Sequence, residues 1–157
     1  MVHYETVLST SCRLTFLQHV GRSRRAAECK ATAAMRDNRL LIVDDDKDTC
    51  SNLSDILTDC GYTVDVAYGG QEGLDLFTQH HHGLALLDYE LPCMTGVELF
   101  GRMRQLRQGV EGLLVTGFAS AKTTKEALAA GLKQVVDKPV DMPQLLSLIR
   151  QILASAA

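Results

Sequence analysis

The stretch at residues 39–45, Arg39-Leu40-Leu41-Ile42-Val43-Asp44-Asp45, decides the fold, because an unbroken aliphatic run leads directly into two carboxylates. Short aliphatic runs without polar alternation are typical of parallel strands that are buried on both faces of a sheet. Three further short runs lead to a polar residue in the same way: 84–87 before Asp88, 113–115 before Thr116, and 135–137 before Lys138. Since the carboxyl ends of parallel strands gather along one edge of a sheet, we expect these polar residues to lie together.

Segments with the three- and four-residue spacing of helices alternate with the runs. The predicted helices lie at about residues 47–60, 70–80, 95–106, 120–131 and 141–152, with caps at Thr95, Ser120 and Asp141. A fifth strand is predicted at 62–67, where the alternation is typical of a sheet edge. Five β-α units with short connections predict an α/β sandwich of three layers, with helices on both faces of a parallel sheet.

The composition suits a single domain, since 157 residues with 46% hydrophobic content can bury one core. Charge is unevenly distributed: residues 1–39 carry seven Lys/Arg against three Asp/Glu, whereas residues 40–157 carry nine against sixteen. An acidic body argues against direct DNA binding, which needs a clustered basic face. No apolar run approaches the length of a membrane span, so we expect no membrane insertion.

Residues 1–38 hold scattered apolar residues and an arginine-rich patch at 22–25, with no period that could bury a face. We therefore expect a disordered basic extension over 1–38 and the folded domain over 39–157. Met35 stands just before the first strand, which suggests the hypothesis that translation starts there. Intact mass of the protein made from its native transcript tests this hypothesis, and a mass that includes residues 1–34 would reject it.

The five cysteines show neither C-x-x-C spacing nor histidines at zinc-ligand intervals, and predict reduced thiols in a cytoplasmic protein. Cys50 and Cys60 fall on the apolar face of a predicted helix, where cysteine acts as a small hydrophobe. Cys93, in a loop near Asp88, is the thiol to test for reactivity. The run His80-His81-His82 is predicted to be a solvated helix end.

The predicted edge combines three carboxylates, a hydroxyl and an ammonium. Asp44, Asp45 and Asp88 supply the oxygen ligands that a hard cation such as Mg²⁺ prefers. Asp88 can act as a nucleophile, because carboxylates form aspartyl-phosphate intermediates when positive charge screens the incoming phosphoryl group. Lys138 can supply that charge and Thr116 a hydroxyl donor. Asp46 and Asp48, by contrast, are interpreted as capping residues of the following helix.

Four motifs in combination resemble the receiver domains of response regulators in two-component signalling. The matching stretches are Leu41-Ile42-Val43-Asp44-Asp45-Asp46, Leu86-Leu87-Asp88-Tyr89-Glu90-Leu91-Pro92-Cys93-Met94-Thr95-Gly96, Leu114-Val115-Thr116-Gly117, and Val136-Asp137-Lys138-Pro139. The resemblance extends from residue 39 to about residue 155. It implies a flavodoxin-like, doubly wound sheet with strand order 2-1-3-4-5 and five helices.

The resemblance also implies roles for individual residues. Asp88 would be the phosphoacceptor, and Mg²⁺ would bind to Asp45, to Asp88 and to the backbone carbonyl of Glu90, with Asp44 acting mainly through water. Thr116 and Lys138 would contact the phosphoryl group, and the peptide before Pro139 would be cis. The donor would be a histidine kinase or a histidine phosphotransfer protein, and the only catalysis would be the domain's own phosphorylation and dephosphorylation.

One position departs from the family pattern. Receivers usually have Tyr or Phe three residues before the lysine, as a switch coupled to the threonine, but this chain has Val135. An aliphatic residue cannot swing a ring into a cavity, although Thr116 can still draw its loop inward. Phe118 and Glu90 are expected to influence how fast water attacks the phosphoaspartate.

Only a few residues follow the last predicted helix, so we expect a stand-alone receiver. It would signal through a partner protein that docks on the face built from the fourth helix, fifth strand and fifth helix. The alternative use of the same chemistry is a phosphorelay shuttle between two histidines. An aspartate-nucleophile phosphatase is disfavoured, because residues 44–48 lack its D-x-D-x-T/V pattern and no segment is long enough for its cap domain. A nucleotide-binding module is disfavoured further, since no glycine-rich loop follows the first strand.

Overall fold

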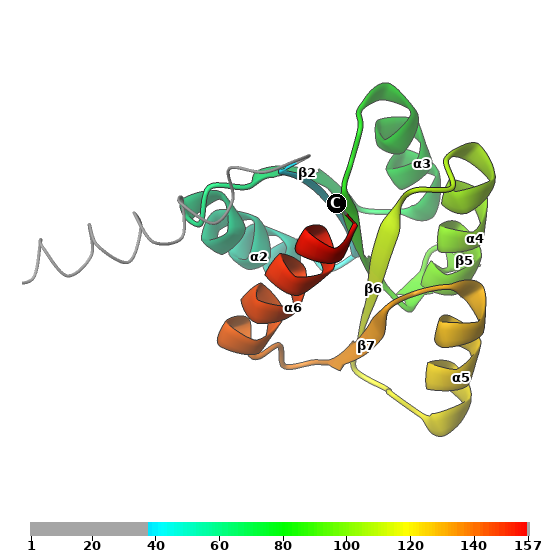
Figure 1. The fold of residues 1–157 in the computed structure, drawn as a ribbon. Coiled ribbons are helices and arrows are strands. Elements are labelled where there is room, and N and C mark those ends of the chain that lie inside the picture. The colour runs from blue at the N-terminus through cyan, green and yellow to red at the C-terminus, as the bar shows by residue number, and fades with distance from the viewer. Residues whose placement is uncertain (1–37, 157) are drawn as a thin grey trace, which may run out of the picture.

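A five-stranded parallel sheet with the order β2-β1-β3-β6-β7 forms the centre of the computed structural model, which describes residues 38–156 (Figure 1). The strands are β1 (Arg39–Val43), β2 (Thr63–Ala67), β3 (Leu84–Asp88), β6 (Glu111–Thr116) and β7 (Gln134–Asp137). The helices of the described part are α2 (Lys47–Asp59), α3 (Gly70–Gln79), α4 (Gly96–Leu106), α5 (Ala121–Ala130) and α6 (Met142–Ser155). The predicted flavodoxin-like fold is confirmed. The predicted strand order is confirmed as well, because numbering the five strands of this sheet along the chain gives the order 2-1-3-4-5. The predicted extension over residues 1–38 lies outside the described residues apart from Asn38.

Helices cover both faces of the sheet, with α2 and α6 on one side and α3, α4 and α5 on the other (Figure 1). Alternate residues of β1 point into two separate cores. Leu41 and Val43 pack with residues of α3 and α4, whereas Leu40 and Ile42 pack with residues of α2 and α6. All four are essentially inaccessible to solvent. The aliphatic run without polar alternation is therefore explained by burial on both faces.

The strand ends are level with one another because of the sheet register. Val43 of β1 lies opposite Leu87 of β3, one residue before Asp44 and Asp88 respectively. Thr116 of β6 lies opposite Asp137 of β7, directly before Lys138. The polar residues that follow the aliphatic runs are consequently brought together at the carboxyl ends of the strands.

The helices begin where capping residues satisfy their first backbone N–H groups. The predicted caps Thr95, Ser120 and Asp141 are confirmed, and Thr95 forms a capping box with Glu98. Asp46 caps α2 and also accepts a hydrogen bond from the Thr49 hydroxyl, which lowers the pKa of the Asp46 carboxyl. The interpretation of Asp46 as a capping residue is confirmed.

A short hairpin between β3 and α4 is an element that sequence reasoning missed. Strands β4 (Glu90–Leu91) and β5 (Met94–Thr95) pair antiparallel across the turn at Pro92 and Cys93. Cys93 is exposed and has a left-handed backbone with φ of 68°. Two-residue strands carry no periodic signal, and the available indication was the proline at the first turn position.

The interpretation of His80, His81 and His82 as a solvated helix end is wrong for His82. His80 and His81 are exposed, but His82 is only 1% exposed. Its Nε2 lies 2.8 Å from Asp65 Oδ2 on the edge strand β2, and its ring stacks on Phe77 of α3. The chain is already entering the sheet here, two residues before β3 begins, so the third histidine turns inward.

Burial lowers the pKa of His82 below its usual 6.5, although the hydrogen bond to Asp65 opposes this shift. Burial would raise the pKa of Asp65, but hydrogen bonds from His82 and Arg39 prevail and lower it. The folded protein therefore favours a neutral imidazole beside a charged carboxylate.

We expect this histidine to make folding stability depend on pH. Below pH 6.5 His82 is protonated in the unfolded chain but stays neutral to a lower pH in the folded protein. The free energy of unfolding should therefore fall as the pH decreases from 7 toward 5. The slope from this single group is at most about 1.4 kcal/mol per pH unit. Urea denaturation of His82→Gln, which keeps a donor for Asp65 but cannot titrate, should show a shallower pH dependence than the wild type. Parallel pH profiles for the two proteins would contradict the assignment.

No helix in the described part of the chain combines the length and apolar character that crossing a bilayer requires.

Candidate functional site

The residues predicted from the four aliphatic runs meet in one pocket of about 260 Å³. It lies at the carboxyl ends of β1, β3, β6 and β7, where the strand order of the sheet reverses. The pocket is lined by Asp44, Asp45, Asp46, Asp88, Glu90, Thr116, Gly117, Phe118 and Lys138. Every residue that the sequence predicted for the site therefore lines this pocket.

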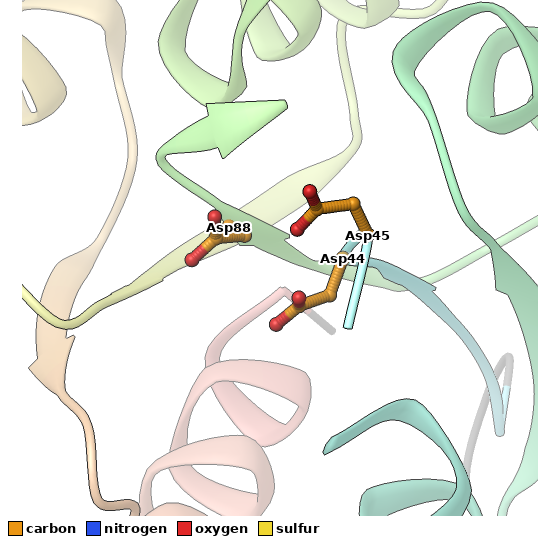
Figure 2. A group of neighbouring side chains, drawn as sticks. All are labelled: Asp44, Asp45 and Asp88. Carbon is orange, nitrogen blue, oxygen red and sulfur yellow. The ribbon is translucent and has the colours of Figure 1, made fainter. Parts of the chain in front are cut away.

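Three carboxylates converge inside this pocket (Figure 2). Each of Asp44, Asp45 and Asp88 offers an oxygen, and these atoms all lie within 4.8 Å of one another. Asp44 and Asp88 are buried, whereas Asp45 is exposed. Like charges at this separation repel, and hard oxygen donors are what Mg²⁺ prefers, so the donor set fits a hard divalent cation.

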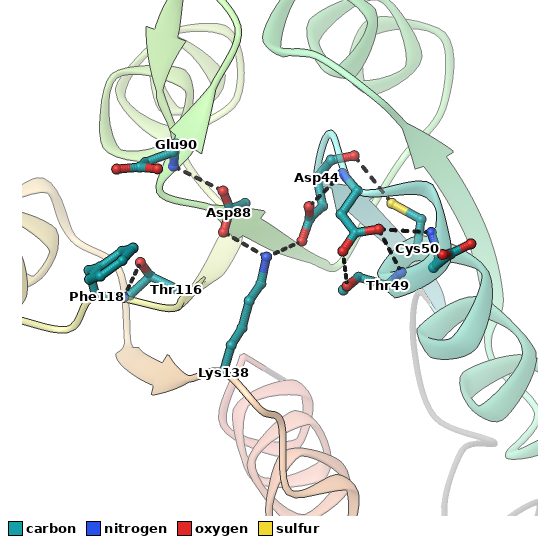
Figure 3. Close-up of polar contacts among 10 residues, drawn as sticks. Asp44, Thr49, Cys50, Asp88, Glu90, Thr116, Phe118 and Lys138 are labelled. Atoms are coloured by element: carbon teal, nitrogen blue, oxygen red, sulfur yellow. Dashed lines mark hydrogen bonds and ion pairs between the residues drawn. The ribbon is translucent and has the colours of Figure 1, made fainter.

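Lys138 lies between two of these carboxylates (Figure 3). Its Nζ is 2.6 Å from Asp44 Oδ2 and 2.9 Å from Asp88 Oδ1. The lysine backbone N–H donates to the carbonyl of Thr116, and the peptide that follows it, before Pro139, is cis as the resemblance implied. Because its Nζ contacts both carboxylates, the lysine side chain reaches across the pocket to the carboxyl ends of β1 and β3.

Burial and ion pairing act in opposite directions on the ionisable groups. Burial raises the pKa of Asp88, although the ammonium of Lys138 opposes that shift. Burial alone would lower the pKa of Lys138, but its bonds to Asp44 and Asp88 outweigh burial and raise it. Lys138 is therefore a stable cation at neutral pH, next to a carboxylate that is poorly solvated.

Backbone donors hold two of the carboxylates in place. The Asp46 N–H donates to Asp44 Oδ1 at 2.9 Å, and the Glu90 N–H donates to Asp88 Oδ2 at 3.0 Å. The Glu90 side chain is exposed and extends away from Asp88 (Figure 3). Both oxygens of Asp88 therefore have a donor, one from Glu90 and one from Lys138.

The hydroxyl of Thr116 is buried at the pocket wall, with the threonine 2% exposed. Its oxygen accepts a hydrogen bond from the Phe118 N–H at 3.2 Å. Phe118 is 77% exposed, and its ring stands at the rim beside Thr116 (Figure 3). The proton of the Thr116 hydroxyl is not used in that hydrogen bond, so the hydroxyl can donate to a ligand in the pocket.

Sequence reasoning missed two residues that support the site. Cys50 was predicted to be a small buried hydrophobe, which is confirmed, but its Sγ also donates to the carbonyl of Asp44 at 3.3 Å. Burial raises the pKa of this thiol to about 11. Gly96 lies directly behind Asp88, because a Cβ added there would collide with the Asp88 carbonyl oxygen. Neither contact has a sequence signal, since both depend on how α2 and α4 dock on the sheet.

We expect Gly96→Ala to destabilise the fold by about 1–3 kcal/mol and to displace Asp88, because backbone atoms cannot move aside as a flexible side chain can. Gly101→Ala, in the same helix α4, is the matched control. Its added Cβ meets nothing within 4 Å, so it should stabilise the helix by about 0.5–1 kcal/mol. Thermal or urea unfolding measures both changes, and equal effects of the two substitutions would contradict the close approach.

Known proteins contain a domain that is similar to this chain in sequence. Residues 40–150 match the family of response regulator receiver domains. The response regulator receiver protein Anae109_2439 of Anaeromyxobacter sp. (strain Fw109-5) is 36% identical over 110 residues, which are 70% of this chain and 46% of that protein. The response regulator ArlR of Staphylococcus aureus is 34% identical over 115 residues, 73% of this chain and 52% of that protein. The chain thus spans about half the length of these two curated relatives.

A solved structure agrees in both fold and sequence. The CheY-like response regulator receiver domain protein from Methanospirillum hungatei JF-1 superposes with a TM-score of 0.74 and 36% identity. The superposition covers 77% of this chain and 97% of that chain. On these matches, the chain belongs to the receiver domain family of two-component response regulators.

Proposed function

We propose that this receiver domain accepts a phosphoryl group on Asp88 from a phosphohistidine, with Mg²⁺ as cofactor, and signals by binding a partner protein. The observation that carries the proposal is the position of Lys138. Its ammonium pairs with both Asp88 and Asp44 in a pocket that also holds the exposed carboxylate of Asp45. A carboxylate placed beside a fixed cation and an open pocket is suited to nucleophilic attack on phosphorus.

The transfer replaces one bond to phosphorus with another. A carboxylate oxygen of Asp88 forms the new O–P bond while the N–P bond of the donor phosphohistidine breaks, and the electron pair of that bond returns to the imidazole. Lys138 neutralises the charge on the phosphoryl oxygens, and the Thr116 hydroxyl donates a hydrogen bond to one of them. The Glu90 N–H orients the Asp88 carboxylate throughout.

We propose that Asp45, Asp88 and the backbone carbonyl of Glu90 hold Mg²⁺ directly, with Asp44 acting through water. When bound, the cation neutralises the carboxylates and the charge that accumulates in phosphoryl transfer. Lys138 and the Asp46 N–H each bind one oxygen of the Asp44 carboxylate. Asp45 is exposed and therefore available as a direct ligand.

The response to phosphorylation would pass through Thr116 and not through an aromatic switch. Val135 of β7 is half-buried and packs against the core cluster under α3, α4 and α5. Its side chain is aliphatic, so the signal would come from the Thr116 loop moving toward the phosphoryl group. We propose that the altered surface is the face formed by α5, β7 and α6, and that a partner protein docks there.

The lifetime of the phosphoaspartate would depend on the rim of the pocket. Phe118 and Glu90 both line it and are both exposed. We propose that these two side chains tune the rate of dephosphorylation by changing how readily water reaches the phosphoaspartate.

Incubation of the full chain with Mg²⁺ and acetyl phosphate, followed by intact mass, tests the proposal. We expect one added phosphoryl group, which disappears in excess chelator. A stable phosphorylated protein that then loses its phosphoryl group to a histidine phosphotransfer protein would favour the relay use, and one that does not would favour the switch. Rapid turnover of many small phosphate esters, with no phosphorylated protein accumulating, would contradict the proposal and favour a phosphatase.

A further inference from the structure

The thiol of Cys50 is hydrogen-bonded to the backbone at the edge of the cation site. Cys50 lies in the first half of α2, is fully buried, and donates from Sγ to the carbonyl oxygen of Asp44 at 3.3 Å (Figure 3). A carbonyl oxygen can only accept, so the thiol is the donor. The rest of the side chain packs in the apolar cluster shared by α2 and α6.

The carbonyl that Cys50 holds belongs to the peptide unit joining Asp44 to Asp45. A peptide unit is planar, so fixing the direction of the Asp44 carbonyl also fixes the N and Cα atoms of Asp45. The other side of Asp44 is fixed as well, because its N–H donates to the Ala67 carbonyl at 3.2 Å. The backbone at the end of β1 is therefore held on both sides of Asp44.

The position of the Asp45 carboxylate depends on that backbone more than the position of the Asp44 carboxylate does. The Asp44 carboxylate is held directly by Lys138 and by the Asp46 N–H. The Asp45 side chain is exposed, and its oxygen lies within 4.8 Å of those of Asp44 and Asp88. A small rotation of the Asp44–Asp45 peptide would move that oxygen out of the group.

We propose that Cys50 is a positioning residue for the divalent-cation site, acting through the Asp44–Asp45 peptide on the direction of Asp45. This inference rests on the cation site of the proposed function. Cysteine suits the position because it is apolar enough for the core cluster and still carries a proton to donate. Outer groups that orient metal ligands influence affinity by tenfold or more when they are lost.

The test is Mg²⁺ affinity of the full-length chain, measured by isothermal titration calorimetry with magnesium chloride. Cys50→Ala and Cys50→Val remove the donor, one leaving a space and the other filling it, and both should weaken binding about tenfold. Cys50→Ser retains a donor to the Asp44 carbonyl and should stay within about twofold of the wild type. A purely structural role would not be rescued by serine, because a hydroxyl is less suited to an apolar core.

Leu53→Val is the matched control, since Leu53 is buried in the same helix and the same core cluster one turn beyond Cys50. It should lower stability slightly and leave the Mg²⁺ affinity unchanged. Wild-type affinity in both Cys50→Ala and Cys50→Val, or equal weakening in Cys50→Ser, would overturn the inference while the cation site stands. If Cys50→Ala does not fold, the comparison of Cys50→Val with Cys50→Ser decides. Absence of Mg²⁺ binding in the wild type would overturn the cation site itself.

Discussion

Asp88→Asn is expected to abolish phosphorylation by acetyl phosphate completely. The substitution removes the negative oxygen that would form the O–P bond, and an amide at this position is not a nucleophile toward phosphorus. The side chain remains close in size, so the Glu90 N–H can still donate to its oxygen. Intact mass after incubation with Mg²⁺ should show only the unmodified protein.

Asp48→Asn is the control for this experiment. Asp48 is exposed in the first turn of α2 and does not line the pocket. The control should accept one phosphoryl group to the same extent as the wild type. Phosphorylation of Asp88→Asn at the wild-type level would show that another group is the acceptor.

Asp45→Asn should weaken Mg²⁺ binding by about a hundredfold without harming the fold. The substitution removes one full negative charge from a group of carboxylates whose oxygens lie within 4.8 Å of one another. A charge in contact with a divalent ion contributes several kcal/mol to its binding even at a high effective dielectric. In the metal-free protein the same change relieves like-charge repulsion, so the free energy of unfolding should stay the same or rise. The Mg²⁺ affinity should therefore fall while the free energy of unfolding does not.

Calorimetric titration and urea denaturation in chelator measure these two quantities for Asp45→Asn. Asp48→Asn again serves as control, because it removes a nearby carboxylate that lies outside the pocket. A parallel loss of stability and affinity in Asp45→Asn would mean that the carboxylate supports the fold and not the cation site.

The sheet and its site could be predicted because their signals are local. A strand that is buried on both faces of the sheet consists of apolar residues without polar alternation. The residue that follows it lies where the carboxyl ends of the strands meet. Thr95, Ser120 and Asp141 were predictable as caps for the same reason, since a cap is defined by the few residues around it.

The remaining features depend on tertiary contacts that no local pattern records. His82 is buried because Asp65, from another strand, and Phe77, from the preceding helix, stand where the chain enters β3. Gly96 is required because α4 starts against the Asp88 carbonyl. Cys50 shows its helical spacing in the sequence, but its bond to Asp44 follows only from how α2 leaves the end of β1.

The central claim is that Asp88, among three neighbouring carboxylates, is the one that becomes an acyl phosphate. Borohydride reduction of the phosphorylated chain tests this claim most directly, because it converts an aspartyl phosphate to homoserine, which tandem mass spectrometry locates in the sequence. We predict homoserine at position 88 alone, in samples prepared with Mg²⁺ and acetyl phosphate. Homoserine at position 44 or 45, or at no position in a protein that carries the added phosphoryl mass, would contradict it.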